Sequence, residues 1–153
     1  MALPRPTAQR AADARTTLEA HHADVWVASA SSDGAPHLVP LSFSWDGADV
    51  TIALKADSPT ARNIVAGGTA RLGFGTTRDV VMVDAMLLSC VSAMEAVDDL
   101  VNRYAAQADW DPRALADRDD YVYLVLRPQR IQVWRESNEL AGRTVMRGGA
   151  WGA

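Results

Sequence analysis

Two short turns divide the first half of this chain into strands. Asp33-Gly34 and Asp46-Gly47 each stand between runs in which apolar and polar residues alternate. Asp-Gly is among the strongest sequence signals for a tight hairpin, because glycine adopts the positive φ angles that such turns require. The first turn joins a strand over 24–30 to one over 37–45, and the second leads into a strand over 49–54. Consecutive hairpins of this kind predict an antiparallel sheet.

The rest of the chain adds more strands and a few helices. Runs of strand type occupy 70–75, 80–95, 121–126 and 129–134, and the last two are joined at Arg127-Pro128. Helical patterns cover about 7–21, the segment after Ser58, and a stretch from Asp98 or Asp99 to 107, with a further short piece from Trp110. About six antiparallel strands with peripheral helices predict a mainly β (α+β) fold, a small closed barrel. No linker divides the chain, so we expect one domain over 1–153, with an N-terminal helix within 1–23.

Pro40 constrains the strand over 37–45. One face of that strand carries His37, Val39 and Leu41, and the other face carries Pro40. Proline has no N–H to donate to a neighbouring strand. The strand therefore needs a sheet edge, a bulge or a ligand at that point.

Composition limits the partners and the compartment. The chain has 153 residues, of which 48% are hydrophobic and 22% charged, typical of a globular domain. A net charge of −4 without a basic run argues against nucleic acid, and no segment has the length and apolarity of a signal peptide core or membrane span. The single cysteine, Cys90, excludes an intrachain disulfide and fits the cytoplasm, and its apolar surroundings predict a small core residue.

No catalytic acid, base or nucleophile is identifiable in the sequence. The three histidines are His21, His22 and His37, and no histidine, cysteine and carboxylate set has the spacing of metal ligands. Nucleophile elbows and glycine-rich nucleotide loops are also missing from the sequence. If the protein is an enzyme, a bound cofactor supplies the chemistry, and the chain binds and orients it.

One segment has the features of a phosphate site. Lys55 is the single lysine beside fourteen arginines, and it lies between a strand and the start of a short helix. A helix start offers free N–H groups and a partial positive charge, which favour phosphate. The alternative interpretation is an ordinary capped helix with solvated charges. The residues that would form the clamp are Lys55, Ser58, Thr60, Arg62 and Asn63.

Three segments together resemble a known family. They are Pro36–Gly47, Leu54–Ile64 and Arg127–Arg147, and their order and spacing span most of the chain. They are similar to the pyridoxamine 5′-phosphate oxidase-like family of flavin- and deazaflavin-binding split β-barrels. The resemblance implies a split β-barrel and a two-fold homodimer, in which each cofactor site draws on both chains.

The resemblance also implies roles for particular residues. Val39, Pro40 and Leu41 would contact the flavin ring through their backbone, and the clamp residues would hold its phosphate. Thr60 stands where the family often has lysine, so this chain would have moved its cation to Lys55. Trp134 and Arg143 would approach the cofactor from the partner. A dimer-core aromatic and a surface charge are the respective alternatives for these two residues.

The function implied is that of a cytoplasmic, homodimeric oxidoreductase. It would transfer hydride between the deazaflavin coenzyme F-420, or FMN, and a small organic substrate. The lysine-poor, arginine-rich composition reflects a GC-rich genome, which favours the deazaflavin. A non-catalytic protein that binds a cofactor or small molecule is the alternative, and a barrel used only for assembly is a third interpretation.

The strand over 80–95 is apolar on both sides, which bears on the dimer. Simple alternation places Leu87, Val91 and Ala93 on one face and puts Met86, Leu88, Cys90 and Met94 on the other. A small barrel has one interior, so we expect a second chain to cover the other face. The tail over 135–153 is too apolar to lie free, and we expect it to reach the partner subunit.

Overall fold

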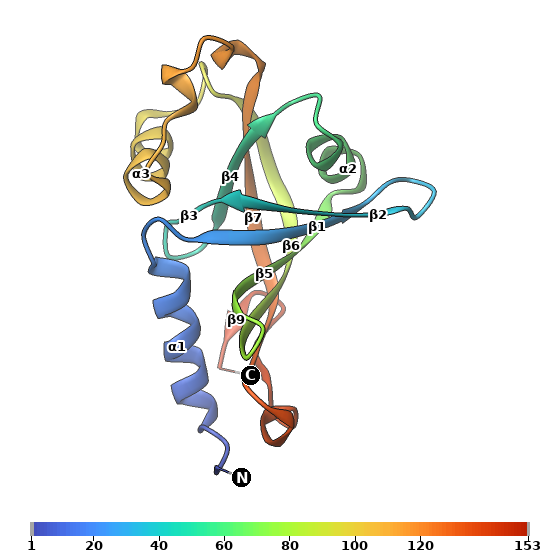
Figure 1. The fold of residues 1–153 in the computed structure, drawn as a ribbon, viewed down its shortest axis with the longest axis vertical. Helices are drawn as coiled ribbons and strands as arrows, with labels where there is room; N and C mark the ends of the chain where they lie inside the picture. Colours follow the sequence, from blue (N-terminus) through green and yellow to red (C-terminus); the bar gives the residue numbers. More distant parts are fainter. Residues whose placement is uncertain (1, 153) are drawn as a thin grey trace.

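The computed structural model describes residues 2–152, which form one curled sheet and three α-helices (Figure 1). The sheet has nine strands, and every pair of neighbours is antiparallel. The helices are α1 (Thr7–Glu19), α2 (Pro59–Gly67) and α3 (Asp98–Ala108). The strands are β1 (Asp24–Ala30), β2 (Pro36–Ser42), β3 (Ser44–Trp45), β4 (Val50–Lys55), β5 (Thr69–Thr76), β6 (Asp79–Ser92), β7 (Tyr121–Trp134), β8 (Thr144–Arg147) and β9 (Ala150–Trp151).

The sheet closes on itself at Phe43. Its main path runs β2-β1-β5-β6-β7-β4-β3, so its two outermost strands are consecutive in the chain and separated by this one residue. Phe43 is buried and packs edge-on against Phe74, with the ring centroids 4.9 Å apart. This closure confirms the predicted mainly β split barrel.

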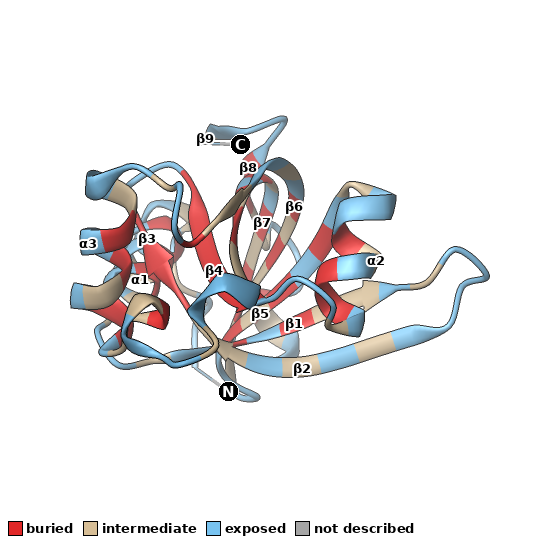
Figure 2. Cartoon of the chain, turned by 90° about the horizontal axis from the view of Figure 1, so that it is seen from above, coloured by how far each residue is buried: buried red, intermediate tan, exposed pale blue. Residues whose placement is uncertain are grey.

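The position of Pro40 agrees with its chemistry. β2 pairs with β1 alone and forms an end of the main path, with Pro40 opposite Trp26. Within residues 2–152, no strand pairs with the outer edge of β2, so the missing N–H of Pro40 breaks no hydrogen bond on that edge. Figure 2 shows β2 as mostly exposed and intermediate residues along its length.

The barrel interior is filled by the inward face of each long strand. Fully buried side chains include Val27, Ile52, Leu72, Val83 and Leu124. α1 adds Ala14 and Leu18 to this core, and α2 adds Ala61 and Ile64. Each of these helices presents one apolar side to the barrel and leaves the other in solvent (Figure 2).

A second apolar cluster lies outside the barrel, under α3. Tyr104 of α3 packs edge-on against Tyr123 of β7, with the ring centroids 5.4 Å apart. Ala53 of β4 and Val101 of α3 belong to the same cluster. β4 and the first residues of β7 are therefore covered on both faces by their own chain. No α-helix of the described chain contributes to an equivalent cluster on the outer face of β1, β5 and β6.

Several predicted boundaries needed correction. The two strands expected over 121–126 and 129–134 are one strand, β7, with an irregularity that accommodates Pro128 opposite Ala85. Asp98 and Asp99 lie in the first turn of α3 and do not cap it, because Val97 occupies the N-cap position. The first helix ends at Glu19.

The expected faces of β6 are wrong beyond Leu87. A bulge between Leu87 and Ser89 shifts the register by one residue, and such a shift reverses every side chain that follows. Cys90 consequently pairs with Leu124 and shares the side of Leu87 instead of that of Met86. Val91 packs in the α3 cluster, so part of the second face is covered by the chain itself. Cys90 is exposed, which also corrects the expectation of a core residue.

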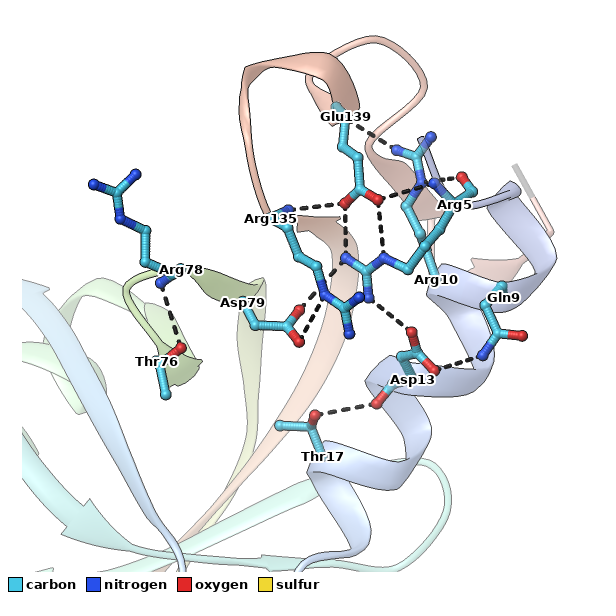
Figure 3. Close-up of polar contacts among 10 residues, drawn as sticks. All are labelled: Arg5, Gln9, Arg10, Asp13, Thr17, Thr76, Arg78, Asp79, Arg135 and Glu139. Atoms are coloured by element: carbon cyan, nitrogen blue, oxygen red, sulfur yellow. Dashed lines mark hydrogen bonds and ion pairs between the residues drawn. The ribbon is translucent and has the colours of Figure 1, made fainter. Parts of the chain in front are cut away.

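A buried ionic network attaches the N-terminal segment to the tail (Figure 3). Glu139 is 3% exposed and accepts hydrogen bonds from the Arg5 backbone N–H (2.9 Å), from Arg5 Nε (2.9 Å) and Nη2 (2.7 Å), and from the Arg135 N–H (2.8 Å). Arg5 also pairs with Asp13 at 2.7 Å. Buried Arg10 donates to the Glu139 carbonyl at 2.9 Å. The hydrogen bonds from Arg5 are the main reason that the pKa of Glu139 falls to about 2.

The tail packs against its own chain. β8 pairs with β7, and Val145 and Met146 lie in the barrel core. The Arg15 guanidinium lies 4.0 Å from the centre of the Trp151 ring. Most of the apolar surface of the tail is thus accounted for within one chain, and its contact with a partner subunit stays a prediction.

The Glu139 network predicts a measurable loss of stability. Glu139→Gln should lower the free energy of unfolding at pH 7 by about 3 kcal/mol, because the Arg5 guanidinium loses the buried anion that it contacts at 2.7 Å. Because folding lowers this pKa, the contribution is complete above about pH 4.5 and disappears as the pH falls towards about 2. The difference between wild type and variant should shrink over that range in urea titrations. Glu136→Gln, which breaks an exposed pair with Arg78, is the control and should cost less than about 1 kcal/mol.

Candidate cofactor site: a groove on the uncovered face of the sheet

Two adjoining hollows form a groove on the outer face of β1, β5 and β6. One has a volume of about 500 Å3 and the other about 490 Å3, and both are lined by Ala28 and Arg71. Each volume is within the range of small-molecule sites. The first hollow extends to Met86, and the second extends to Trp26 and Trp134.

A glycine keeps the second hollow open. Gly73 lies between Trp26 on β1 and Met82 on β6 in the register of the sheet. A Cβ atom at this position would lie 3.5 Å from Met82 Sδ and 3.8 Å from Trp26 Cβ. The missing side chain therefore leaves space between an indole and a thioether, the kind of surface that accepts a flat apolar ring.

Three charged side chains form a row across the outer face of the sheet, and two of them, Arg71 and Asp84, line the groove. Arg71, Asp84 and Arg130 are cross-strand neighbours on β5, β6 and β7. Arg71 Nε lies 3.1 Å from one oxygen of Asp84, and Arg130 Nη2 lies 2.6 Å from the other. Two guanidinium groups share one carboxylate, so the row carries one net positive charge.

Trp134 and Arg143 are close to each other in the structure. Trp134 lines the second hollow, and the Arg143 guanidinium lies 5.7 Å from the centre of its ring. The backbone carbonyl of Arg143 accepts a hydrogen bond from the Val133 N–H at 2.8 Å. The predicted pair thus exists within one chain, at the end of the groove.

The predicted phosphate clamp is a capped helix start. Ser58 is the N-cap of α2, and its hydroxyl accepts a hydrogen bond from the Ala61 N–H at 3.2 Å, as predicted for this residue. Lys55 is exposed, and its Nζ lies 2.7 Å from Asp117. Hydrogen bonding to Asp117 raises the pKa of Lys55 and lowers that of Asp117. The lysine already has an anionic partner, so an incoming phosphate would have to compete with it.

The other clamp residues face different surroundings. Thr60 is 2% exposed and belongs to the buried side of α2, whereas Arg62 is exposed. Asn63 Nδ2 donates to Ser29 Oγ at 3.2 Å, and Ser29 lines the first hollow. Of the five clamp residues, Asn63 therefore lies nearest to the groove, and burial hides Thr60 from a ligand in this chain.

The hairpin residues lie beside the groove with their side chains turned in opposite directions. Val39 and Leu41 pack against the barrel core, and Pro40 is exposed. Leu38 is 59% exposed and lines the second hollow. Leu38 is the residue of β2 that a ligand in the second hollow would meet, and contact with the backbone of 39–41 stays a prediction.

The predicted cofactor residues fall into two groups at opposite ends of the molecule. Lys55 pairs with Tyr121, the first residue of β7, whereas Trp134 is the last residue of that strand. Its 14 residues span about 40 Å along the strand. One small cofactor cannot contact both Lys55 and Trp134 of the same chain. A single site that uses both residues requires a second copy of the protein.

Sequence reasoning missed the residues that shape the groove itself. Trp26, Arg71, Gly73 and Met82 all point outward from their strands. Alternation along 24–30, along 70–75 and along the first part of 80–95 could have placed them on one face. A lone glycine inside a strand is also a known sign that another group approaches the backbone.

Comparison with known proteins identifies the family. A family model described as pyridoxamine 5′-phosphate oxidase matches residues 12–135. The chain belongs to this family. The match covers the barrel strands from β1 to β7, which form the groove, and confirms the resemblance seen in the sequence.

Solved structures share the fold at low sequence identity. An F-420 reductase aligns with a TM-score of 0.64 and 20% identity over 76% of this chain and 94% of its own. General Stress Protein 26 from Bacillus anthracis gives a TM-score of 0.56 and 16% identity over 80% and 92%. A heme binding protein from Mycobacterium smegmatis gives 0.66 and 20% over 95% of this chain and 59% of its own. No curated protein sequence matches the chain.

Over residues 2–152, no helix is both long and apolar enough to span a membrane. The same residues contain no group of three or more histidine, cysteine or acidic side chains arranged to hold a metal ion.

Gly73 offers a test of the groove that leaves the fold intact. Gly73→Val should fill the space between Trp26 and Met82 and weaken the binding of any flat ligand by about tenfold or more. Stability should be unchanged or slightly higher, because valine favours strands and Gly73 does not have a positive φ angle. Gly67→Ala, at a glycine with open space around it, is the control. Unchanged FMN or F-420 affinity in Gly73→Val, measured by fluorescence titration, would contradict a ligand at this position.

Proposed function

We propose that this protein is an oxidoreductase that uses a flavin-type cofactor, either the deazaflavin F-420 or FMN, on a small organic substrate. The single observation that carries the proposal is the groove, which has the volume of a small-molecule site and a glycine floor between Trp26 and Met82. The family includes flavin-dependent oxidoreductases, and one structural relative is an F-420 reductase.

The proposal assigns each part of the cofactor to particular residues. The ring would lie in the groove against Gly73 and the backbone of 39–41, beside the Trp134 side chain that lines the same hollow. The phosphate would lie towards the start of α2 in the other chain of a two-fold dimer, where Lys55, Ser58, Arg62 and Asn63 would hold it. When bound, the cofactor supplies hydride transfer, and the protein contributes position, exclusion of water and nearby charge.

Exposed apolar side chains near the groove support a two-fold dimer as part of the proposal. Trp26, Leu38, Met86 and Leu88 are 42% to 59% exposed on the face that carries the groove or beside it. Such apolar exposure favours a partner surface. A two-fold dimer would cover it, and would bring the two separated groups of predicted residues to one site. Cytoplasmic location remains part of the proposal.

A non-catalytic binding protein is the second candidate. It is favoured by one observation: among the residues that line the two hollows, the carboxylate is that of Asp84, and this side chain already pairs with Arg71 and Arg130. One structural relative is named a heme binding protein. Turnover separates the two candidates: bound, reduced cofactor that passes no hydride to quinones, enones or nitroaromatics would favour the binding protein.

Cofactor titration tests the leading proposal. Purified protein is titrated with F-420 and with FMN, and binding is followed by fluorescence. We expect at least one of them to bind in the micromolar range or tighter, which corresponds to about 8 kcal/mol. Failure of both to bind below high micromolar concentration would contradict the proposal.

Lys55 and Asp117 together test the phosphate contact. Lys55→Ala should weaken binding of a phosphate-bearing cofactor by about 10- to 100-fold, because a charge-assisted hydrogen bond is lost. Asp117→Asn should strengthen the same binding, because it removes the carboxylate that competes for Lys55. Both side chains are exposed, so the thermal unfolding midpoint should change little. Equal cofactor affinity in wild type and both variants would mean that Lys55 is an ordinary surface charge.

A further inference from the structure

Arg71 occupies an unusual position for a surface arginine. It lines both hollows of the groove, and its cross-strand neighbour on β1 is Ala28, whose side chain is too small to cover it. Gly73 lies two residues further along the same strand and has no side chain. The guanidinium therefore lies in the middle of an open groove whose other outward side chains are mainly apolar.

Of the two arginines that flank Asp84, Arg71 makes the weaker contact with its carboxylate. Arg130 donates from Nε to Asp84 Oδ2 at 2.7 Å, and its Nη2 lies 2.6 Å from the same oxygen. Arg71 approaches the other oxygen at 3.1 Å as an ion pair, without a hydrogen bond of normal geometry among residues 2–152. Asp84 is bound mainly by Arg130, so Arg71 keeps donors for a ligand. Its side chain is 51% exposed.

We propose that Arg71 binds the carboxylate of the substrate, and that the substrate is a flat, largely apolar organic acid. This proposal rests on the function proposed above, because it places the substrate in the same groove as the cofactor ring. The planar guanidinium can donate two parallel hydrogen bonds to a carboxylate. The net charge of the row matches one anionic group, and the walls formed by Trp26, Leu38 and Met86 match an aromatic body.

Cofactor phosphate is the weaker candidate for the same arginine. The helix start at Ser58 already provides backbone N–H groups and the positive end of a helix, which suit phosphate. Arg71 projects from the middle of β5, where no helix begins. It therefore offers a ligand its guanidinium group alone, without backbone N–H groups. A ligand with its charge attached directly to an aromatic ring fits this position best.

A matched pair of probes tests the proposal. The full-length protein is titrated with 2-naphthoate and with 2-naphthamide, which differ in charge and hardly in shape, and tryptophan fluorescence reports binding. We expect wild type to bind the carboxylate about tenfold or more tightly than the amide. Arg71→Gln should abolish this preference, and Arg71→Lys should retain part of it. Arg118→Gln removes the same charge from an exposed position outside the groove and should leave the preference unchanged.

Asp84 provides the opposite test. Asp84→Asn removes the competing carboxylate and should increase naphthoate affinity without changing naphthamide affinity.

Equal binding of the two probes by wild type, or a preference that survives in Arg71→Gln, would overturn the proposal. A loss of the dimer in Arg71→Gln, measured by sedimentation, would also overturn it, because Arg71 would then be an interface residue. FMN and F-420 titrations of the same samples keep the two proposals apart. A protein that binds neither cofactor but prefers naphthoate through Arg71 would refute the cofactor and leave this site standing.

Discussion

Closure of the sheet at Phe43 determines which surfaces of the molecule are covered and which stay open to a ligand or a partner. Because the two outermost strands of the path are β2 and β3, the sheet must curl until they meet, and it encloses one apolar interior. α3 covers the outer face where β4 and β7 lie. The outer face of β1, β5 and β6 is left with exposed apolar side chains and the groove. The candidate site is therefore the part of a double-sided sheet that the chain does not cover.

The ionic network around Glu139 holds in place the segment after β7, which borders this uncovered face. Arg5 and Arg10 hold the segment after β7 through Glu139, at both its carboxylate and its carbonyl (Figure 3). Val145 and Met146 anchor the following strand in the core. Trp134 and Arg143 lie on either side of this anchored segment, so their contact across 5.7 Å is positioned by the barrel. A tail held this firmly presents Trp134 to a ligand or a partner surface with little freedom to move.

Local sequence patterns predicted most of the fold. Asp33-Gly34, Asp46-Gly47 and Ser58 each specify a turn or a cap through chemistry within a few residues, and the strands and helix they delimit are present. The errors arose where contacts between residues far apart in the sequence determine the local structure. Pro128 looked like a strand break, but its neighbours on β6 accommodate it within one long strand. The bulge after Leu87 reversed the side chains beyond it, including Cys90, and the sequence around it carries no sign of the extra residue.

The candidate site was predictable only in part, for the same reason. The cap at Ser58 and the tail pair were recognisable from local motifs, whereas the groove depends on which outward residues the register brings together. The role of Gly73 depends on Trp26, which is far from it in sequence, and on Met82, its partner across the β5–β6 hairpin. The partner of Lys55 is Asp117, which approaches from the segment before β7. Burial of Thr60 likewise follows from how α2 packs on the barrel.

The central claim is that two chains build each cofactor site, with the α2 region from one and Trp134 from the other. Mixing two variants with weakened binding tests it directly: Lys55→Ala and Trp134→Ala are unfolded together, refolded and titrated with cofactor. If the site is shared, a mixed dimer has one site with both native residues, and random pairing should restore about one quarter of the sites to wild-type affinity. If Lys55 and Trp134 of the same chain served one site, or if the protein bound cofactor as a monomer, no mixture would recover any tight binding.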